Sequence, residues 1–368
     1  MIVKWKAQLN GMKPYQPGRS VDDVKKMFGL TEIVKLASNE NPFGASPKVH
    51  KFIEQLSINH AIYPDGYASG LRQALAESVG IEENQLLFGN GSDEIISIIS
   101  RSLLQPGVNT VMATPSFSQY RHNALIEGAE VREIPLINGS HDLQEMHSQI
   151  DENTAVVWLC SPNNPTGTLI EQKQLDEFIQ KVPQEVLIVL DEAYFEYIND
   201  PSYKNSIDFI KKHGNVLVMR TFSKAYGLAG FRVGYAIGQK DLICRLDPVR
   251  APFNNTVISQ DVAKVALQDT VFLEQCREKN EIGKKQFNDF ATDNRLHIYP
   301  TQGNFVLLEV KVDSDYVFEE LMKKGYIIRS GNALGTPGYI RVTIGTQSQN
   351  EDFLHKLSDV LNHAGVFA

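Results

Sequence analysis

Short apolar runs alternate with longer segments of helical character over the first two thirds of the chain. The runs lie at residues 86–89, 109–114, 129–136, 154–160, 185–194, 215–223 and 232–238. Between the first two runs, residues 92–104 place four isoleucines and Leu103 on one helical face. Strands that are buried on both faces are continuously apolar rather than alternating. The order therefore predicts an α/β fold with a mostly parallel, seven-stranded sheet between helices.

The last part of the chain has a different order of helical and apolar segments. A long, largely helical stretch at 256–291 is followed by apolar runs that a single helical segment, 314–325, interrupts. These later runs lie at 296–310, 326–330 and 339–345. They predict a smaller α+β domain, which the N-terminal segment joins. The expected division is a small domain from residues 1–50 and 286–368, and a large domain from residues 51–285.

Composition narrows the function. The 368 residues carry a formal net charge of −8, which argues against a nucleic-acid-binding surface. No stretch approaches the roughly 18 to 20 apolar residues of a membrane span, and the first residues lack the apolar core of a secretion signal. We therefore expect a cytoplasmic protein. The three cysteines lie far apart and no two of the nine histidines have i, i+4 spacing, so neither a disulfide framework nor a metal site is expected.

In an open α/β sheet, ligands bind beyond the carboxyl ends of the strands, so the residues after each run are informative. The first run turns through Gly89 and Gly91 into a helix that opens with Ser92 and Asp93. Free N–H groups at a helix N-terminus attract anions such as phosphate. The alternative is a glycine-eased turn with Ser92 as the N-cap. Taken alone, the turn leaves both interpretations open.

Three further strand ends carry polar side chains. Asn164 follows the run at 154–160, and Lys224 follows the run at 215–223. Within the run at 185–194, the apolar part ends at Asp191, three residues before Tyr194. A turn, an N-cap and a surface lysine are the alternative interpretations. Pyridoxal 5′-phosphate requires these parts together: a lysine for the Schiff base, a carboxylate beside the pyridine nitrogen and an anion cradle. The set therefore predicts this cofactor, with Lys224 as the Schiff-base lysine.

Two groups of short motifs occur along the chain. The first group is GNGSDE, PSFSQY, SPNNPTG, DEAYFEY, TFSKAYGLAGFRVGY and YIRVTIG. The second is PYQPG, LASNENPFG, YPDG and QGNFVLLE. The first group resembles the class I and II, fold-type-I pyridoxal-phosphate aminotransferases, and the second is similar to the histidinol-phosphate aminotransferases within that family. The resemblance runs from about Pro14 to Gly345, which is nearly the whole chain.

The resemblance implies roles around the cofactor ring. Lys224 forms the Schiff base and moves the proton between the substrate carbon and the cofactor. Asp191 pairs with the pyridine nitrogen, and Tyr194 and Asn164 contact the ring oxygen O3′. Phe117 stacks on the ring where many relatives carry tyrosine, which removes a hydroxyl but keeps the aromatic face; core packing is the alternative.

The cofactor phosphate has its own implied contacts. The backbone around Ser92 and Asp93, the Ser223 hydroxyl and Arg232 hold it within one chain. Tyr63 matches a tyrosine that reaches the phosphate in the neighbouring subunit. The resemblance thus implies a homodimer with shared active sites, whereas Tyr63 taken alone would be a turn residue.

Four residues are implied in substrate binding, and one of them is Asn164, which also contacts the cofactor ring. Arg341 grips the α-carboxylate, for which a guanidinium is suited because it binds bidentately. Arg329 and Tyr15 match positions that contact the substrate phosphate; a solvated strand-end arginine and a rigid linker are the alternatives. The implied reaction is transamination between L-histidinol phosphate and 2-oxoglutarate, which gives 3-(imidazol-4-yl)-2-oxopropyl phosphate and L-glutamate in histidine biosynthesis.

Other functions remain to be distinguished. A broad aromatic amino acid aminotransferase and a phosphothreonine-type decarboxylase share the fold. A non-catalytic binding module is disfavoured because Lys224, Asp191 and Arg341 are all present. A nicotinamide-dependent dehydrogenase is weaker still, because no GxGxxG motif is followed by an acidic residue about 20 positions on.

Overall fold

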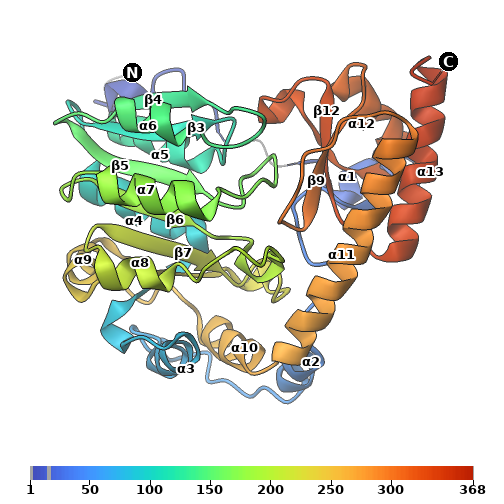
Figure 1. Cartoon of the computed structure of the whole chain (residues 1–368). Helices are drawn as coiled ribbons and strands as arrows, with labels where there is room; N and C mark the ends of the chain where they lie inside the picture. The colour runs from blue at the N-terminus through green and yellow to red at the C-terminus, as the bar shows by residue number, and fades with distance from the viewer. Residues whose placement is uncertain (1–2, 15–17, 368) are drawn as a thin grey trace.

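A seven-stranded sheet forms the larger part of the computed structural model, which describes residues 3–14 and 18–367 (Figure 1). Its strand order is β2-β8-β7-β6-β5-β3-β4. The strands are β2 (Leu86–Asn90), β3 (Asn109–Thr114), β4 (Glu130–Pro135), β5 (Thr154–Cys160), β6 (Leu187–Asp191), β7 (Val216–Thr221) and β8 (Val233–Ile237). Strand β8 runs antiparallel to β2 and β7, and the other neighbours are parallel. The predicted mostly parallel, seven-stranded sheet is confirmed.

Helices cover both faces of this sheet (Figure 1). In β7, Val216 and Val218 belong to one apolar core, while Leu217 and Met219 belong to the core on the opposite face. This double burial is why the strands are continuously apolar. The helices of this part are α2 (Pro47–Glu54), α3 (Ser69–Val79), α4 (Ser92–Leu103), α5 (Gln119–Glu127), α6 (Leu143–Ser148), α7 (Gln172–Lys181), α8 (Ile207–Lys212), α9 (Lys240–Leu246) and α10 (Val257–Leu267).

A second, smaller unit follows and uses both ends of the chain. Its sheet has the order β11-β12-β9, and a two-stranded pair joins β1 of the N-terminal segment to β10. Its elements are α1 (Val21–Phe28), β1 (Val34–Lys35), α11 (Thr270–Asp293), β9 (Phe305–Glu309), α12 (Ser314–Lys323), β10 (Tyr326–Ile327), β11 (Arg329–Ser330), β12 (Tyr339–Thr343) and α13 (Gln347–His363). The apolar run at 326–330 thus forms two short strands, because β10 pairs with the N-terminal segment and β11 with β12.

Helix α11 links the two units. It begins at Thr270, near α2 and α10, and runs as one continuous helix up to the small sheet (Figure 1). The expected boundary at residue 285 lies inside this helix, so the division of the chain at that point stays a prediction.

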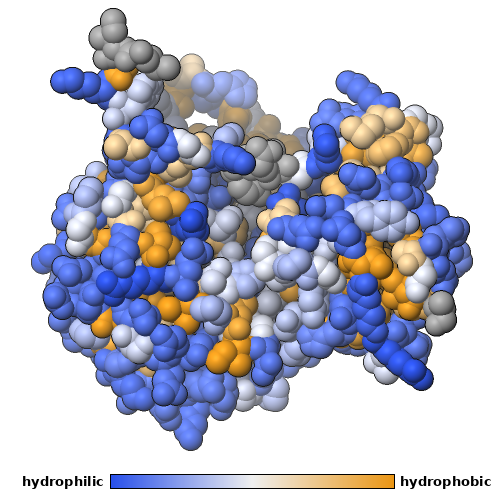
Figure 2. Space-filling view, turned by 90° about the horizontal axis from the view of Figure 1, so that it is seen from above, coloured by the Kyte–Doolittle hydropathy of each residue, from blue (hydrophilic) through white to orange (hydrophobic). Residues whose placement is uncertain are grey.

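Hydrophobic side chains on the face seen from above lie in small groups among hydrophilic ones (Figure 2). Within residues 3–14 and 18–367, none of the helices is both long and apolar enough to cross a bilayer.

A buried ion pair joins β6 and β7 close to their carboxyl ends. Arg220 donates to the Oε2 atom of Glu192 at 2.8 Å, and the two side chains are 3% and 0% exposed. The other carboxylate oxygen accepts from the hydroxyls of Tyr203 and Ser206. The ring of Phe195 covers the guanidinium, with 3.4 Å between the centroid and the Arg220 Cζ atom. Because the two charges are paired and the carboxylate accepts two further hydrogen bonds, their burial is compatible with a stable fold.

We expect Arg220→Met to lower the free energy of unfolding by about 3 to 5 kcal/mol, because Glu192 would remain as an unpaired buried charge. Urea-induced unfolding measures this loss. The matched control is Lys285→Gln, which breaks an exposed pair with Asp289 and should cost less than about 1 kcal/mol. Equal losses of unfolding free energy in the two variants would show that burial of the pair between Arg220 and Glu192 does not matter for stability.

Candidate active site

The carboxyl ends of β5, β6 and β7 place Asn164, Asp191 and Lys224 at one edge of the large sheet, as the sequence predicts. The Nζ atom of Lys224 donates to the Ser38 carbonyl at 3.0 Å and lies 5.7 Å from the centre of the Tyr194 ring. Burial, reinforced by the positive charge of Arg341, lowers the pKa of Lys224 to about 8. A lysine with this pKa has a substantial neutral fraction near pH 8, and the neutral amine is the nucleophilic form.

Asp191 is a buried carboxylate, 3% exposed. It accepts a 2.5 Å hydrogen bond from the Tyr120 hydroxyl and a 3.1 Å bond from the Ala193 N–H. Burial raises its pKa to about 6. Within the described part of the chain, no lysine, arginine or histidine side chain is hydrogen-bonded to Asp191. The carboxylate therefore suits a cationic ring nitrogen supplied by a ligand.

Tyr120 is a site residue that the sequence analysis missed. Its ring stacks on Trp158 at 4.8 Å and meets Phe117 edge-on at 5.6 Å. The residue is fully buried, so its hydroxyl is held against Asp191. The sequence signals were its place as the last residue of the PSFSQY motif and its position three residues after Phe117, a spacing that brings side chains together on a helix.

Glycines shape the predicted phosphate turn between β2 and α4. The N-cap of α4 is Gly91, with φ 74°, so the alternative in which Ser92 is the cap is wrong. A Cβ atom at Gly91 would collide with the guanidinium of Arg232. Arg232 also contacts the Asp93 carboxylate and the Ser223 hydroxyl, both at 3.3 Å. The N-terminus of the 12-residue α4 and this guanidinium together form a cradle for an anion.

Arg341 extends from β12 of the small sheet and is 6% exposed. It donates to the Asn164 side-chain oxygen at 2.5 Å and to the Ala37 carbonyl at 2.7 Å. Arg329 lies opposite Arg341 in the ladder between β11 and β12. Its guanidinium lies against Gly18, the residue that ends the PYQPG motif. Tyr15, in the same motif, lies outside the described residues.

Tyr63 differs from the other predicted residues because its side chain is 77% exposed. Its ring stacks on Phe253 at 4.7 Å, with an angle of 18° between the ring planes. Within a single chain, the tyrosine therefore faces solvent.

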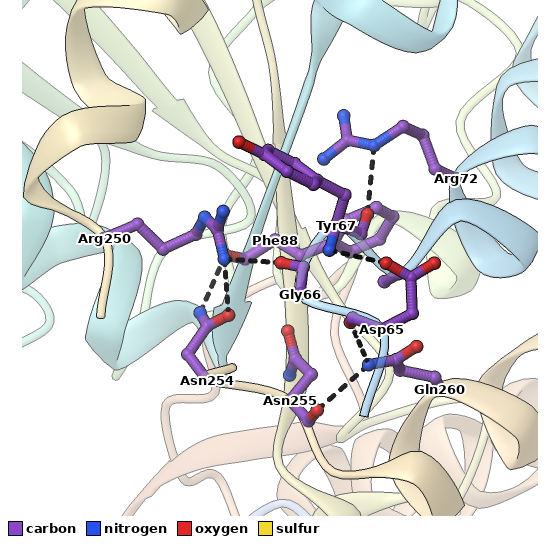
Figure 3. Close-up of a pocket in the computed structure, with 10 residues that line it drawn as sticks. Asp65, Gly66, Tyr67, Arg72, Phe88, Arg250, Asn254, Asn255 and Gln260 are labelled. Carbon is purple, nitrogen blue, oxygen red and sulfur yellow. Dashed lines mark hydrogen bonds between the residues drawn. The ribbon is translucent and has the colours of Figure 1, made fainter. Parts of the chain in front are cut away.

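Polar contacts anchor the loop that follows Tyr63 (Figure 3). Arg250 donates to the Gly66 carbonyl at 2.9 Å, and Gln260 donates to the Asp65 carbonyl at 2.9 Å. Asn255 donates to the carbonyl of Gly89, in the strand that leads into the phosphate turn. The loop of Tyr63 and the phosphate turn are thus connected through one set of hydrogen bonds.

The residues fit the predicted cofactor, pyridoxal phosphate. The cradle at Gly91 suits its phosphate, Asp191 suits a protonated ring nitrogen, and Lys224 is an amine of lowered pKa beside them. Among the described residues, no group of three or more histidine, cysteine, aspartate or glutamate side chains is arranged to hold a metal ion.

Comparison with known proteins identifies the family. Residues 31–357 match the model of aminotransferase class I and II. The chain belongs to this family. It is 58% identical to the histidinol-phosphate aminotransferase of Lysinibacillus sphaericus (strain C3-41), over 100% of both chains. It is 50% identical to that of Geobacillus sp. (strain WCH70), over 97% of this chain and 98% of the relative.

A solved structure shows the same fold. The histidinol-phosphate aminotransferase of Sinorhizobium meliloti in complex with pyridoxal-5′-phosphate superposes with a TM-score of 0.90. It is 25% identical in sequence, with 99% of each chain covered. The predicted fold class is therefore confirmed, and the family makes the chain an aminotransferase.

We expect Gly91→Ala to raise the dissociation constant for pyridoxal phosphate at least about tenfold, because the new Cβ displaces Arg232 and a charged hydrogen bond is lost. Titration of the apoenzyme, followed by fluorescence, measures this constant. Gly107→Ala is the matched control: φ there is also positive, at 90°, but the new Cβ meets no atom within 4 Å. Equal constants for the two variants would rule out the displacement of Arg232.

Proposed function

We propose that this chain is a pyridoxal-phosphate-dependent histidinol-phosphate aminotransferase. It transfers an amino group between L-histidinol phosphate and 2-oxoglutarate, forming 3-(imidazol-4-yl)-2-oxopropyl phosphate and L-glutamate, within histidine biosynthesis. The observation that carries the proposal is the convergence of Lys224, Asp191 and Arg341 on one edge of the large sheet. Full-length similarity to proteins of that name supports it.

Each side chain has a separate task in this proposal. When bound, the cofactor supplies an electrophilic carbon and an electron-withdrawing ring. Lys224 would hold the cofactor through its amine and, once free of it, would carry the proton at the substrate Cα. Asp191 holds the proton on the ring nitrogen by opposite charge. Tyr194 and Asn164 orient the ring at its O3′ atom.

The anion contacts divide between cofactor and substrate. The helix N-terminus at Ser92 and Asp93, with Ser223 and Arg232, would hold the cofactor phosphate. Phe117, which meets Tyr120 edge-on, would lie over the ring. Arg341 binds the carboxylate of glutamate and also the phosphate of histidinol phosphate in the alternate half-reaction. Arg329 and Tyr15 add contacts that only the phosphate reaches.

The substrate assignment is tested by half-reaction kinetics. Arg329→Gln should lower kcat/KM for histidinol phosphate about ten- to a hundredfold more than for glutamate, because one charged hydrogen bond is lost. Arg341→Gln, the comparison variant, should lower both. Single-turnover absorbance measurements with each substrate give the two values. An equal loss for both substrates in Arg329→Gln would favour a broad aromatic amino acid aminotransferase instead.

A homodimer with shared sites is part of the proposal, and an exposed apolar patch supports it. The patch consists of Ile62, Tyr63, Tyr67 and Phe253, which are 67%, 77%, 61% and 45% exposed. Clustered exposed apolar side chains mark interaction sites. The hydrogen bonds in Figure 3 hold the loop of this patch in place, so little ordering is needed when a second copy binds. Tyr63 would then reach the partner's cofactor phosphate.

Subunit complementation tests the shared site. Lys224→Ala and Tyr63→Ala chains should each be inactive. After random exchange of equal amounts, about half of the dimers are mixed and each mixed dimer has one intact site of two, so about a quarter of the wild-type activity should return. Activity before and after exchange, with mixed dimers verified by mass spectrometry, gives the result. Sites contained within single chains would show no recovery.

A further inference from the structure

Asn39 is a buried asparagine that the proposed chemistry does not use. It lies between β1 and α2, is 1% exposed and has a positive φ of 55°. Its Nδ2 atom lies 3.0 Å from the hydroxyl oxygen of Tyr194. Non-glycine residues adopt this backbone region at a cost, and asparagine tolerates it best. The Asn39 amide therefore reaches Tyr194 from a backbone conformation that carries some strain.

Neighbouring hydrogen bonds determine which way the Asn39 amide points. The Asn39 N–H donates to the Oγ1 atom of Thr343 at 2.9 Å, so that oxygen is an acceptor there. The hydroxyl proton of Thr343 is left to donate to Oδ1 of Asn39 at 3.2 Å. With Oδ1 accepting from Thr343, the NH2 group faces Tyr194. An NH2 group can only donate, so the Tyr194 oxygen must be the acceptor.

The tyrosine has one hydroxyl proton, and the bond from Asn39 leaves that proton free for a different acceptor. Burial raises the pKa of Tyr194 above its ordinary value, so the hydroxyl stays protonated over the working pH range. We infer that Asn39 is a positioning residue, which occupies the acceptor side of the Tyr194 hydroxyl and directs its proton toward the phenolic oxygen of the cofactor. This inference rests on the proposed contact between Tyr194 and that oxygen.

The same segment also contacts the anion-binding strand. Arg341 and Thr343 are two residues apart on β12 and therefore lie on the same face of the strand. Arg341 donates to the Ala37 carbonyl, and Thr343 bonds to Asn39. Asn304, which precedes β9, donates to the Asn39 carbonyl at 3.0 Å. Asn39 thus connects the small unit, which carries Arg341, to Tyr194 in the large unit.

The test is a pH titration of the visible absorbance of the cofactor-loaded enzyme without substrate. A donor to the phenolic oxygen stabilises its ionised form, so losing the donor raises the pH midpoint. Tyr194→Phe should raise the midpoint by about one to two pH units, the equivalent of one charged hydrogen bond. Asn39→Gly, which tolerates the positive φ, should raise it by about half a unit or more, because the hydroxyl proton is no longer directed.

A variant that reverses the hydrogen bond between residue 39 and Tyr194 separates the direction of that bond from any effect on packing. Asn39→Asp keeps the shape of the side chain, but its carboxylate accepts from Tyr194 and so draws the proton away from the cofactor. It should raise the midpoint nearly as much as Tyr194→Phe. In the Tyr194→Phe background, Asn39→Gly should shift the midpoint by less than about 0.2 unit if it acts only through the hydroxyl. Asn138→Gly, at an exposed residue with φ 50°, is the matched control and should leave the midpoint unchanged.

Two outcomes would overturn the inference. An unchanged midpoint in Tyr194→Phe would remove the proposed tyrosine contact, and the inference with it. A shift in Tyr194→Phe but none in Asn39→Gly or Asn39→Asp would retain the tyrosine contact and refute the role of Asn39 alone. Thermal unfolding of each apoprotein reports any change in packing separately from the midpoint.

Discussion

Two adjacent carboxylates, Asp191 and Glu192, lie buried at the end of β6, and the active site depends on how differently they are satisfied. Glu192 has a full partner in Arg220 and two further hydroxyl donors. Among the residues that the structure describes, Asp191 accepts hydrogen bonds only from the Tyr120 hydroxyl and one backbone N–H. Because a buried charge is costly unless it is paired, Asp191 is prepared for a cation that the described chain does not itself provide.

The ion pair between Glu192 and Arg220 helps to hold Asp191 in position. Arg220 lies on β7, four residues before Lys224, so the ion pair holds the ends of β6 and β7 in a fixed relation. The Asp191 carboxylate and the Lys224 amine, which we propose to act on the cofactor, extend from these two strand ends. Rigid strands position such groups more accurately than loops do.

The remaining contacts come from the small unit. Arg341 bonds to Asn164 beyond the end of β5, and Asn39 bonds to Tyr194 beyond the end of β6. Asn164 and Tyr194, which we propose to contact the cofactor, are therefore hydrogen-bonded to Arg341 and Asn39. Arg341 is the proposed substrate-anion residue, and Asn39 bonds to Thr343 on the same strand. A change in the position of β12 when an anion binds would reach both of them directly.

The sequence by itself determined the sheet and the strand-end residues, because double burial makes strands continuously apolar and because ligands bind beyond their carboxyl ends. It could not reveal Tyr120 or Asn39 as site residues, since each acts through a partner distant in the chain: Asp191 is 71 positions from Tyr120, and Tyr194 is 155 from Asn39. Only the tertiary structure showed that 326–330 serves two sheets and that Gly91, rather than Ser92, caps α4. Local patterns record burial, whereas hydrogen-bond partners are decided when distant segments pack together.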